Sequence, residues 1–215
     1  MNKLKLILLF VSFIFLTPKI FSYRDTCRIS SKEYYTAKRI DTLSLHAMRM
    51  LSELNASVMK HVNSDKDSPD YGGIYCPHCK LYHTRAAETV YPFAYEYHKM
   101  GNKTYLRAAI NAGNWLIKQQ EDNGAWLETP EEWTGTTTDQ VLMMALAYPI
   151  LKSHLSKKEK DSWLHSIEKA GDYLVKVMSP QFASINYCAT TTASLMAVNE
   201  IINKQSYQNK ARELA

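Results

Sequence analysis

Two seven-residue segments of the chain repeat one another, and this repeat narrows the range of possible folds sharply. Ala112–Lys118 reads AGNWLIK, and Ala170–Lys176 reads AGDYLVK, 58 positions further on. Five of the seven positions are identical or differ only as Ile and Val do. Helical segments that recur in this way belong to units that cannot bury their apolar face alone and stack on their neighbours. The repeat therefore predicts stacked helical hairpins.

Apolar residues recur at helical spacing along most of the chain, and no segment shows a convincing strand pattern. The predicted helices cover residues 31–62, 86–100, 104–120, 138–155, 157–178 and 190–203, with another starting at Tyr207. The predicted helices 104–120 and 157–178 carry many charges. The helix 138–155 is apolar on nearly every side and must be enclosed. We predict an all-α fold of alternating inner and outer helices.

The first 22 residues have the features of a secretory signal peptide. Lys3 and Lys5 precede an apolar run from Leu6 to Leu16, and the small residue Ser22 suits a cleavage position. The run is too short to span a membrane. We predict a secreted or periplasmic protein with no membrane segment after signal removal. The predicted segments are a signal peptide (1–22), an N-terminal part with a long helix (23–70) and a hairpin domain (71–215).

Composition and charge exclude two classes of protein. Hydrophobic residues make up 46% of the chain, which is too many for a disordered protein. The formal net charge is +5, but three lysines lie in the signal region, so the mature chain carries only about +2. Because no Lys/Arg cluster is present either, we expect no nucleic-acid partner.

The end of the chain repeats the opening of an outer helix. Tyr207–Ala211 resembles Tyr105–Ala109, and the sequence stops at Ala215 without a cap or polar tail. We expect an N-terminal piece of a longer protein, with about three hairpins. Because its inner helices would leave apolar faces open, we expect little or no activity from this piece alone.

The helix alternation, the signal, Gly-Ala-Trp at 124–126 and Trp-Thr-Gly-Thr-Thr-Thr-Asp at 133–139 together resemble the α/α-toroid carbohydrate enzymes. This group includes six-hairpin glycosidases and heparinase-type polysaccharide lyases, and the resemblance covers about Tyr71 to Ala215. It implies an incomplete (α/α) toroid and a glycan substrate. The function we favour is a polysaccharide lyase that cleaves a uronate-containing glycan by β-elimination. The alternatives are a six-hairpin glycoside hydrolase and a non-catalytic helical binding or scaffold module.

Three connections should lie at one end of the stack, which we call the rim. Successive helices in such a stack run antiparallel, so every outer-to-inner connection falls on the same side. These connections are residues 71–85, 121–137 and 179–190. Residues with catalytic or binding chemistry are therefore expected there.

The first rim connection holds a Cys-x-x-Cys sequence followed by histidine. Cys76, Cys79 and His83 have the residue types and spacing of zinc ligands, with a fourth ligand still to be found. Candidates for that ligand are His78, Cys27, Cys188 or a distant residue. A disulfide is the main alternative, because an exported protein meets an oxidising compartment. Free thiols are a third possibility, and no other cofactor is indicated.

The same connection offers groups that suit an acidic sugar. The Arg85 guanidinium can bind a carboxylate through two parallel hydrogen bonds, and His83 can move a proton. Tyr75 is a candidate substrate-binding residue. The alternative is a structural role, with Thr84 capping a helix and Arg85 paired with Glu88.

The second rim connection combines tryptophans with carboxylates. Trp126 and Trp133 could stack on sugar rings, and Glu128 could bind hydroxyl groups. In a hydrolase, Asp139 and Glu128 would be the acid and base. Structural alternatives are hairpin packing for Trp126 and a first-turn acid that favours the helix dipole for Asp139.

The third rim connection leads into a helix through Asn186 and Tyr187. Heparinase-type lyases use an asparagine at the start of such an inner helix to neutralise the uronate carboxylate, and the resemblance implies this role for Asn186. Tyr187 would then move the proton, although it stands where a histidine is more typical. Capping of the helix by Asn186 is the alternative.

Overall fold

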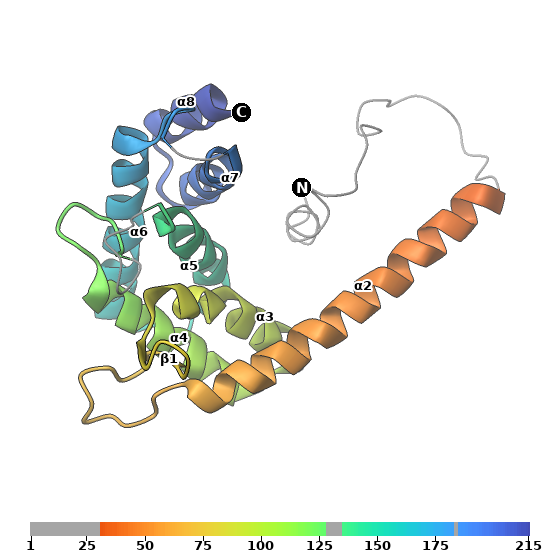
Figure 1. The fold of residues 1–215 in the computed structure, drawn as a ribbon, viewed down its shortest axis with the longest axis horizontal. Coiled ribbons are helices and arrows are strands. Elements are labelled where there is room, and N and C mark those ends of the chain that lie inside the picture. The colour runs from red at the N-terminus through yellow and green to blue at the C-terminus, as the bar shows by residue number, and fades with distance from the viewer. Residues whose placement is uncertain (1–30, 128–134, 183–184) are drawn as a thin grey trace. The chain divides into compact units, whose positions relative to one another are not determined.

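The computed structural model describes residues 31–127, 135–182 and 185–215. The regular secondary structure of this part of the chain is helical apart from two very short strands, which confirms the predicted all-α class. The chain divides into two units after His46, and the unit Ala47–Ala215 holds the features discussed below (Figure 1). The predicted signal peptide, Cys27, Glu128 and Trp133 lie outside the described residues. No helix in the described ranges is long and apolar enough to cross a bilayer.

The helices follow the predicted order with small shifts at their ends. They are α2 (Ser31–Val58), the short 3₁₀ helices η1 (Met59–His61) and η2 (Thr84–Thr89), α3 (Val90–Met100), α4 (Lys103–Gln119), α5 (Thr137–Leu151), α6 (Lys157–Val177), α7 (Ile185–Ile202) and α8 (Gln205–Leu214). Two antiparallel strands, β1 (Tyr75–Cys76) and β2 (Leu81–Tyr82), form a hairpin between α2 and η2. The sequence did not predict them, because two residues are too few to show an alternating pattern.

The helices of the second unit form two rows. α3, α5 and α7 pack side by side in one row, and α4, α6 and α8 form the other row against it (Figure 1). These rows match the predicted inner and outer helices. The described part of the chain contains only three such hairpins, so closure into a ring stays a prediction.

Burial separates the two rows. The inner helix α5 is buried on nearly every side, from its first-turn threonines to Leu151. The outer helices α4 and α6 are amphipathic and bury one face each, through Trp115 and Leu116 in α4 and through Trp163 and Ile167 in α6. A helix enclosed by others carries no polar face, which is why α5 lacks the periodicity of its neighbours.

The sequence repeat marks equivalent contacts between successive outer helices. The indole Nε1 of Trp163 in α6 donates a hydrogen bond of 2.8 Å to Oδ1 of Asn114 in α4. One helix further on, the hydroxyl of Tyr207 in α8 donates a hydrogen bond of 2.8 Å to Oδ1 of Asp172 in α6. The Asn/Asp position of each repeat therefore holds the aromatic residue of the next outer helix.

The last turns of α2 are anchored to α3 through a buried carboxylate. Glu96 is 7% exposed and accepts hydrogen bonds from the Ser52 hydroxyl at 2.9 Å and from Nδ2 of Asn55 at 3.3 Å. Nδ2 of Asn55 also donates to the carbonyl oxygen of Pro92 at 3.3 Å. These bonds satisfy buried polar groups that would otherwise destabilise the fold. They also fix the position of η1, which directly follows α2.

Candidate functional site

A tight turn between β1 and β2 holds the Cys-x-x-Cys sequence. The N–H of Cys79 donates to Sγ of Cys76 at 3.3 Å, and the N–H of Lys80 donates to the carbonyl oxygen of Cys76 at 2.8 Å. Lys80 has a φ of 58°, in the left-handed region, where the chain reverses into β2. The turn brings the side chains of the two cysteines within hydrogen-bonding distance.

The environment of Cys76 favours its thiolate. Hydrogen bonds from the N–H and the side chain of Cys79 lower the pKa of Cys76 below its ordinary value. A thiolate is the form that binds metals, so this pair has the chemistry of half a zinc site. However, no group of three His, Cys, Asp or Glu in the described ranges could hold a metal ion. Cys76, Cys79 and His83 do not form a ready three-ligand cluster, and zinc binding stays a prediction.

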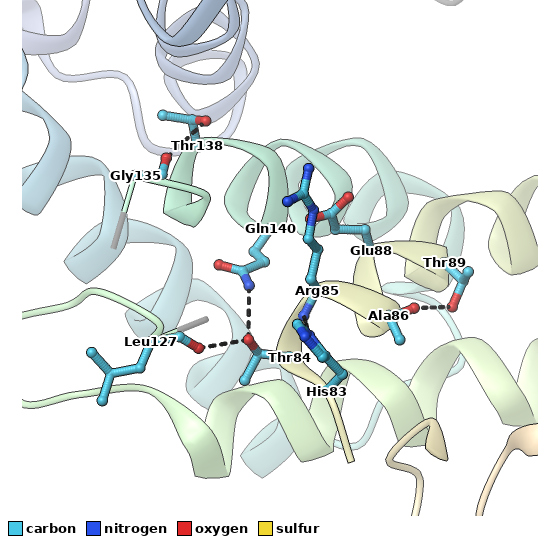
Figure 2. Close-up of polar contacts among 10 residues, drawn as sticks. All are labelled: His83, Thr84, Arg85, Ala86, Glu88, Thr89, Leu127, Gly135, Thr138 and Gln140. Carbon is cyan, nitrogen blue, oxygen red and sulfur yellow. Dashed lines mark hydrogen bonds and ion pairs between the residues drawn. The ribbon is translucent and has the colours of Figure 1, made fainter. Parts of the chain in front are cut away.

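The 3₁₀ helix η2 follows the hairpin and carries Arg85. Its cap is His83, whose Nδ1 accepts a hydrogen bond of 3.3 Å from the N–H of Arg85, so the cap is not Thr84. Nε of Arg85 lies 3.8 Å from Oε1 of Glu88, as the structural alternative predicted. Figure 2 shows the end of the Arg85 side chain next to Glu88 and directed away from His83. The Arg85 side chain is about half exposed and remains accessible to a ligand.

A hollow of about 470 Å³ lies beside η2, and we call it the Arg85 hollow. Its volume is within the range of about 300–1,000 Å³ that is common for ligand pockets. The apolar part of its lining comes from Val58, Ile74, Ala86, Pro92 and Met143, and the polar part from His61, Tyr75, Cys76, Arg85, Glu88 and Thr89. The Arg85 hollow therefore combines an apolar surface with the Arg85 cation and with side chains that can donate or accept a proton, such as His61 and Tyr75.

Tyr75 presents an aromatic ring to this hollow. It is 37% exposed, and its ring packs edge-on against Tyr82 on β2, with 5.5 Å between the ring centroids. The cross-strand pairing of these two residues holds the Tyr75 ring in place. A fixed, partly exposed ring suits the apolar face of a sugar.

His61 is a residue of the hollow that sequence reasoning missed. It ends η1, is exposed, and lines the same hollow as Tyr75 and Arg85. It belongs to no spacing motif, and only the fold places it close to residues that follow it by 14 and 24 positions. A lone histidine near the end of the predicted helix 31–62 therefore gave no signal in the sequence.

Trp126 does not line the site, which corrects the predicted role in sugar stacking. Its side chain is 0% exposed, and its indole Nε1 donates a hydrogen bond of 2.8 Å to the carbonyl oxygen of Leu116 in α4. Thr137 Oγ1 accepts a further hydrogen bond from the Trp126 N–H at 3.0 Å. Trp126 thus has the packing role that was its alternative. The predicted positions Glu128 and Trp133 cannot be placed, because residues 128–134 are outside the described ranges.

Asp139 lies in the first turn of α5 and is partly exposed. This position fits the alternative role, since a carboxylate near a helix N-terminus interacts favourably with the helix dipole. Its neighbours in that turn, Thr137, Thr138 and Gln140, are all fully buried. Asp139 is not part of the lining of the Arg85 hollow.

Asn186 and Tyr187 lie in the first turn of α7, which begins at Ile185 rather than at Thr190 as predicted. Asn186 is exposed and Tyr187 is half-buried. The carbonyl oxygen of Asn186 accepts a hydrogen bond of 2.9 Å from the Thr190 hydroxyl inside the helix. Neither residue lines the Arg85 hollow.

The structure thus brings together part of the predicted site. Tyr75, Cys76 and Arg85 share one hollow with His61, whereas the predicted residues of α5 and α7 are not in its lining. An arginine beside a tyrosine and a histidine can hold an anion and exchange a proton with a bound molecule. This combination suits acid–base chemistry on an anionic ligand.

Comparison with known proteins identifies a family and a relative whose sequences are similar to this chain. The family model described as the ulvan lyase N-terminal domain matches residues 51–215. A broad-specificity ulvan lyase of Formosa agariphila is 25% identical over 180 residues, which cover 80% of this chain and 28% of that enzyme. The chain thus spans little more than a quarter of the length of this relative. No solved structure matches the chain.

Proposed function

The chain belongs to the ulvan lyase N-terminal domain family, and from this membership we propose that it is part of an exported polysaccharide lyase that cleaves a uronate-containing glycan by β-elimination. The observation that carries the proposal is the family match, which extends over residues 51–215. The name of the similar Formosa agariphila enzyme points to ulvan as the first glycan to test. The Arg85 hollow supports the proposal, because its polar groups are those that an elimination requires.

The reaction needs three functions from the protein. A base removes the proton from C5 of the uronate, the electron pair of that C–H bond forms the C4=C5 double bond, and the bond from C4 to the glycosidic oxygen breaks. The leaving oxygen takes up a proton. The C5 proton is acidic enough only when the neighbouring carboxylate is neutralised by a cation or hydrogen-bond donors.

Arg85 is the group we propose for binding the carboxylate. Its planar guanidinium offers two parallel donors, and Asn186 remains a second candidate because it is exposed at the start of an inner helix. Since α7 contributes nothing to the lining of the Arg85 hollow, Arg85 is the better-placed of the two.

The proton-transfer groups we propose are Tyr75 and His61, with Tyr187 as the alternative from the sequence. His83 has a more limited role. Its Nδ1 accepts the Arg85 N–H, so a neutral His83 ring carries its hydrogen on Nε2. In that state Nε2 donates a hydrogen bond and is not free to act as a base, and His83 does not line the Arg85 hollow, so we assign it the capping of η2 rather than proton transfer.

Ultraviolet absorbance tests the reaction class. The C4=C5 bond formed by elimination is conjugated with the carboxylate and absorbs, whereas hydrolysis produces reducing ends without this absorbance. We expect the absorbance to rise on ulvan when the chain is assayed within the complete protein that contains it. New reducing ends without absorbance would instead support the glycoside hydrolase alternative and its Asp139. The absence of both signals would support a binding module.

Substitution of Arg85 tests the site. Arg85→Lys keeps the charge and loses the paired donors, so we expect affinity for a glucuronate oligosaccharide to fall about tenfold, which is about 1.4 kcal/mol. The matched control is Arg107→Lys, which makes the same change at an exposed arginine of α4 outside the hollow. Equal affinities for Arg85→Lys and the unsubstituted protein would exclude Arg85 from carboxylate binding.

A further inference from the structure

One buried hydroxyl connects three segments of the rim. Oγ1 of Thr84 donates a hydrogen bond of 2.7 Å to the carbonyl oxygen of Leu127 and accepts one of 3.2 Å from Nε2 of Gln140 in α5. Figure 2 shows the Thr84 hydroxyl between these two groups. The partners are 43 and 56 positions away in the chain. Thr84 therefore joins η2 to the connection after α4 and to the first turns of α5.

Water has little access to this junction. Thr84 is 4% exposed and Gln140 is 0% exposed, so water cannot readily replace a lost partner. The junction also needs a group that donates and accepts at once, because one partner is a carbonyl and the other an amide N–H. Threonine and serine meet this requirement at this size, whereas valine has the shape of threonine without the hydroxyl.

The first turns of α5 are also held from the α7 side. Oγ of Ser194 lies 2.6 Å from the carbonyl oxygen of Thr138 and 2.7 Å from that of Thr190, and Ser194 is fully buried. One hydroxyl therefore ties α7 to α5, and another ties α5 to η2. The start of α5 is thus a fixed reference against which η2 is placed.

The position of Thr84 in the sequence gives this junction a functional meaning. Thr84 lies between the capping residue His83 and Arg85, the residue proposed to bind the carboxylate. We propose that the Thr84 hydroxyl is a positioning group that holds Arg85 at the hollow by fixing η2 to Leu127 and Gln140. This inference rests on the proposed function for the role of Arg85. A shift of about 1 Å in a binding group can lower activity by two orders of magnitude, so such a junction matters for the site.

Two substitutions at Thr84 separate the hydroxyl from the shape of the side chain. Thr84→Val keeps the shape and removes both hydrogen bonds, whereas Thr84→Ser keeps the hydroxyl and loses a methyl group. The control is Ser166→Ala, which removes another buried hydroxyl that bonds a glutamine: Oγ of Ser166 donates to Oε1 of Gln120 at 2.8 Å, within the outer row. This control reports the effect of a lost buried hydroxyl that is not next to Arg85.

Two readouts are compared, hydrogen exchange and the dissociation constant for a glucuronate oligosaccharide. We expect Thr84→Val to speed exchange in residues 84–87 and 124–127 and to weaken binding about tenfold. In Thr84→Ser, the exchange rates and the dissociation constant should stay within about threefold of those of the unsubstituted protein. Ser166→Ala should leave binding unchanged. If Thr84→Val does not fold, Gln140→Met removes one of the two bonds and is judged by the same criteria.

The outcomes separate this inference from the proposed function. Exchange and binding in Thr84→Val equal to those of Thr84→Ser would overturn the positioning role. Equal loss of binding in Thr84→Val and Ser166→Ala would also overturn it, because general destabilisation would then explain the loss. If the unsubstituted protein binds no glycan, the proposed function fails, and exchange alone still decides whether Thr84 fixes η2.

Discussion

The indole of Trp163 lies directly on Gly113, so that a β-carbon on this glycine would overlap Cζ2 of the tryptophan ring. Gly113 is the glycine of the first repeat segment, in α4, and Trp163 comes from the next outer helix, α6. The second repeat has the same arrangement in a looser form. A β-carbon on Gly171 would stand 3.0 Å from Cζ of Tyr207. Glycine at this repeat position thus allows successive outer helices to approach closely.

The two glycines predict different costs for the same substitution. Gly113→Ala forces the Trp163 ring to move within a packed core, and we expect a loss of about 1–3 kcal/mol in the free energy of unfolding. Gly171→Ala needs only a small shift of Tyr207 and gains about 0.5–1 kcal/mol of helix propensity, so its stability should stay within about 1 kcal/mol of the unsubstituted protein. Urea unfolding followed by tryptophan fluorescence measures both. Equal losses would show that the Trp163 contact does not set the cost.

Glu159 connects α4 to the start of α6, and its ionisation predicts that the free energy of unfolding depends on pH. Its carboxylate accepts hydrogen bonds from the Ser156 hydroxyl and N–H at 2.6 and 2.8 Å, and another from Nδ2 of Asn114 at 3.1 Å. The bonds from Ser156 are the main reason that the pKa of Glu159 lies below its ordinary value of 4.5. A carboxyl whose pKa is lowered by folding stabilises the protein above the unfolded pKa, and this stabilisation is lost as pH falls through the folded pKa.

We therefore expect Glu159→Gln to cost about 0.5–1 kcal/mol at neutral pH, because the amide can still accept a hydrogen bond from Ser156 but lacks the charge that strengthens it. The difference from the unsubstituted protein should shrink as pH falls below about 4.5. Thermal unfolding from pH 7 to pH 3 measures it, with Glu200→Gln, on the exposed side of α7, as the control for lost charge. A difference that is the same at both ends of this range would contradict the prediction.

The rows of helices could be predicted because burial determines which positions are apolar, on one face of an outer helix and on nearly every side of an enclosed one. The largely apolar pattern of 138–155 and the two AGxxLxK segments reflect contacts that α5, α4 and α6 make with their neighbours. The start of α7 was placed too late, at Thr190. Asn186, Tyr187 and Cys188 are polar or small residues that give no apolar period, although they form the first turn of the helix.

The site was less predictable because its residues meet only through the fold. Trp126 stands in a Gly-containing connection, and nothing in that local sequence shows that its indole reaches the carbonyl oxygen of Leu116. Thr84 gave the signal of a helix cap, but its partners Leu127 and Gln140 lie in other elements. Arg85 and Tyr75 could be named from their chemistry, whereas the presence of His61 in the same hollow needed the structure.

Cys76 should react as a thiolate at lower pH than an ordinary cysteine. The N–H of Cys79 is the main cause of its lowered pKa, and the side chain of Cys79 is the second. Alkylation by iodoacetamide, followed at this residue by peptide mass spectrometry, should reach half its maximal rate below the ordinary thiol pKa of 9.0. Cys79→Ala should raise this midpoint only in part, because its backbone N–H remains. A midpoint at or above 9.0 in the unsubstituted protein would contradict the role of this turn.

The same assay tests the zinc prediction. A bound metal ion would protect Cys76 and Cys79 from alkylation, so removal of metal by a chelator should speed the reaction of both residues. Rates that do not change with chelator, together with the absence of zinc by elemental analysis of the purified protein, would show that the pair does not hold this metal.

Tyr75 should contribute to glycan binding through its ring rather than through its hydroxyl. The ring is held edge-on by Tyr82 and is exposed at the Arg85 hollow. Tyr75→Ala should therefore weaken binding of a glucuronate oligosaccharide about 5- to 10-fold, which corresponds to about 1–1.4 kcal/mol of aromatic contact. Tyr75→Phe should bind within about twofold of the unsubstituted protein, yet lose elimination activity if the hydroxyl moves the proton. Calorimetry measures the affinity, and Met100→Ala, which removes a 72% exposed apolar side chain outside the hollow, is the control. Equal binding by Tyr75→Ala and Met100→Ala would show that sugars do not contact this ring, and it would move the substrate site away from the hairpin.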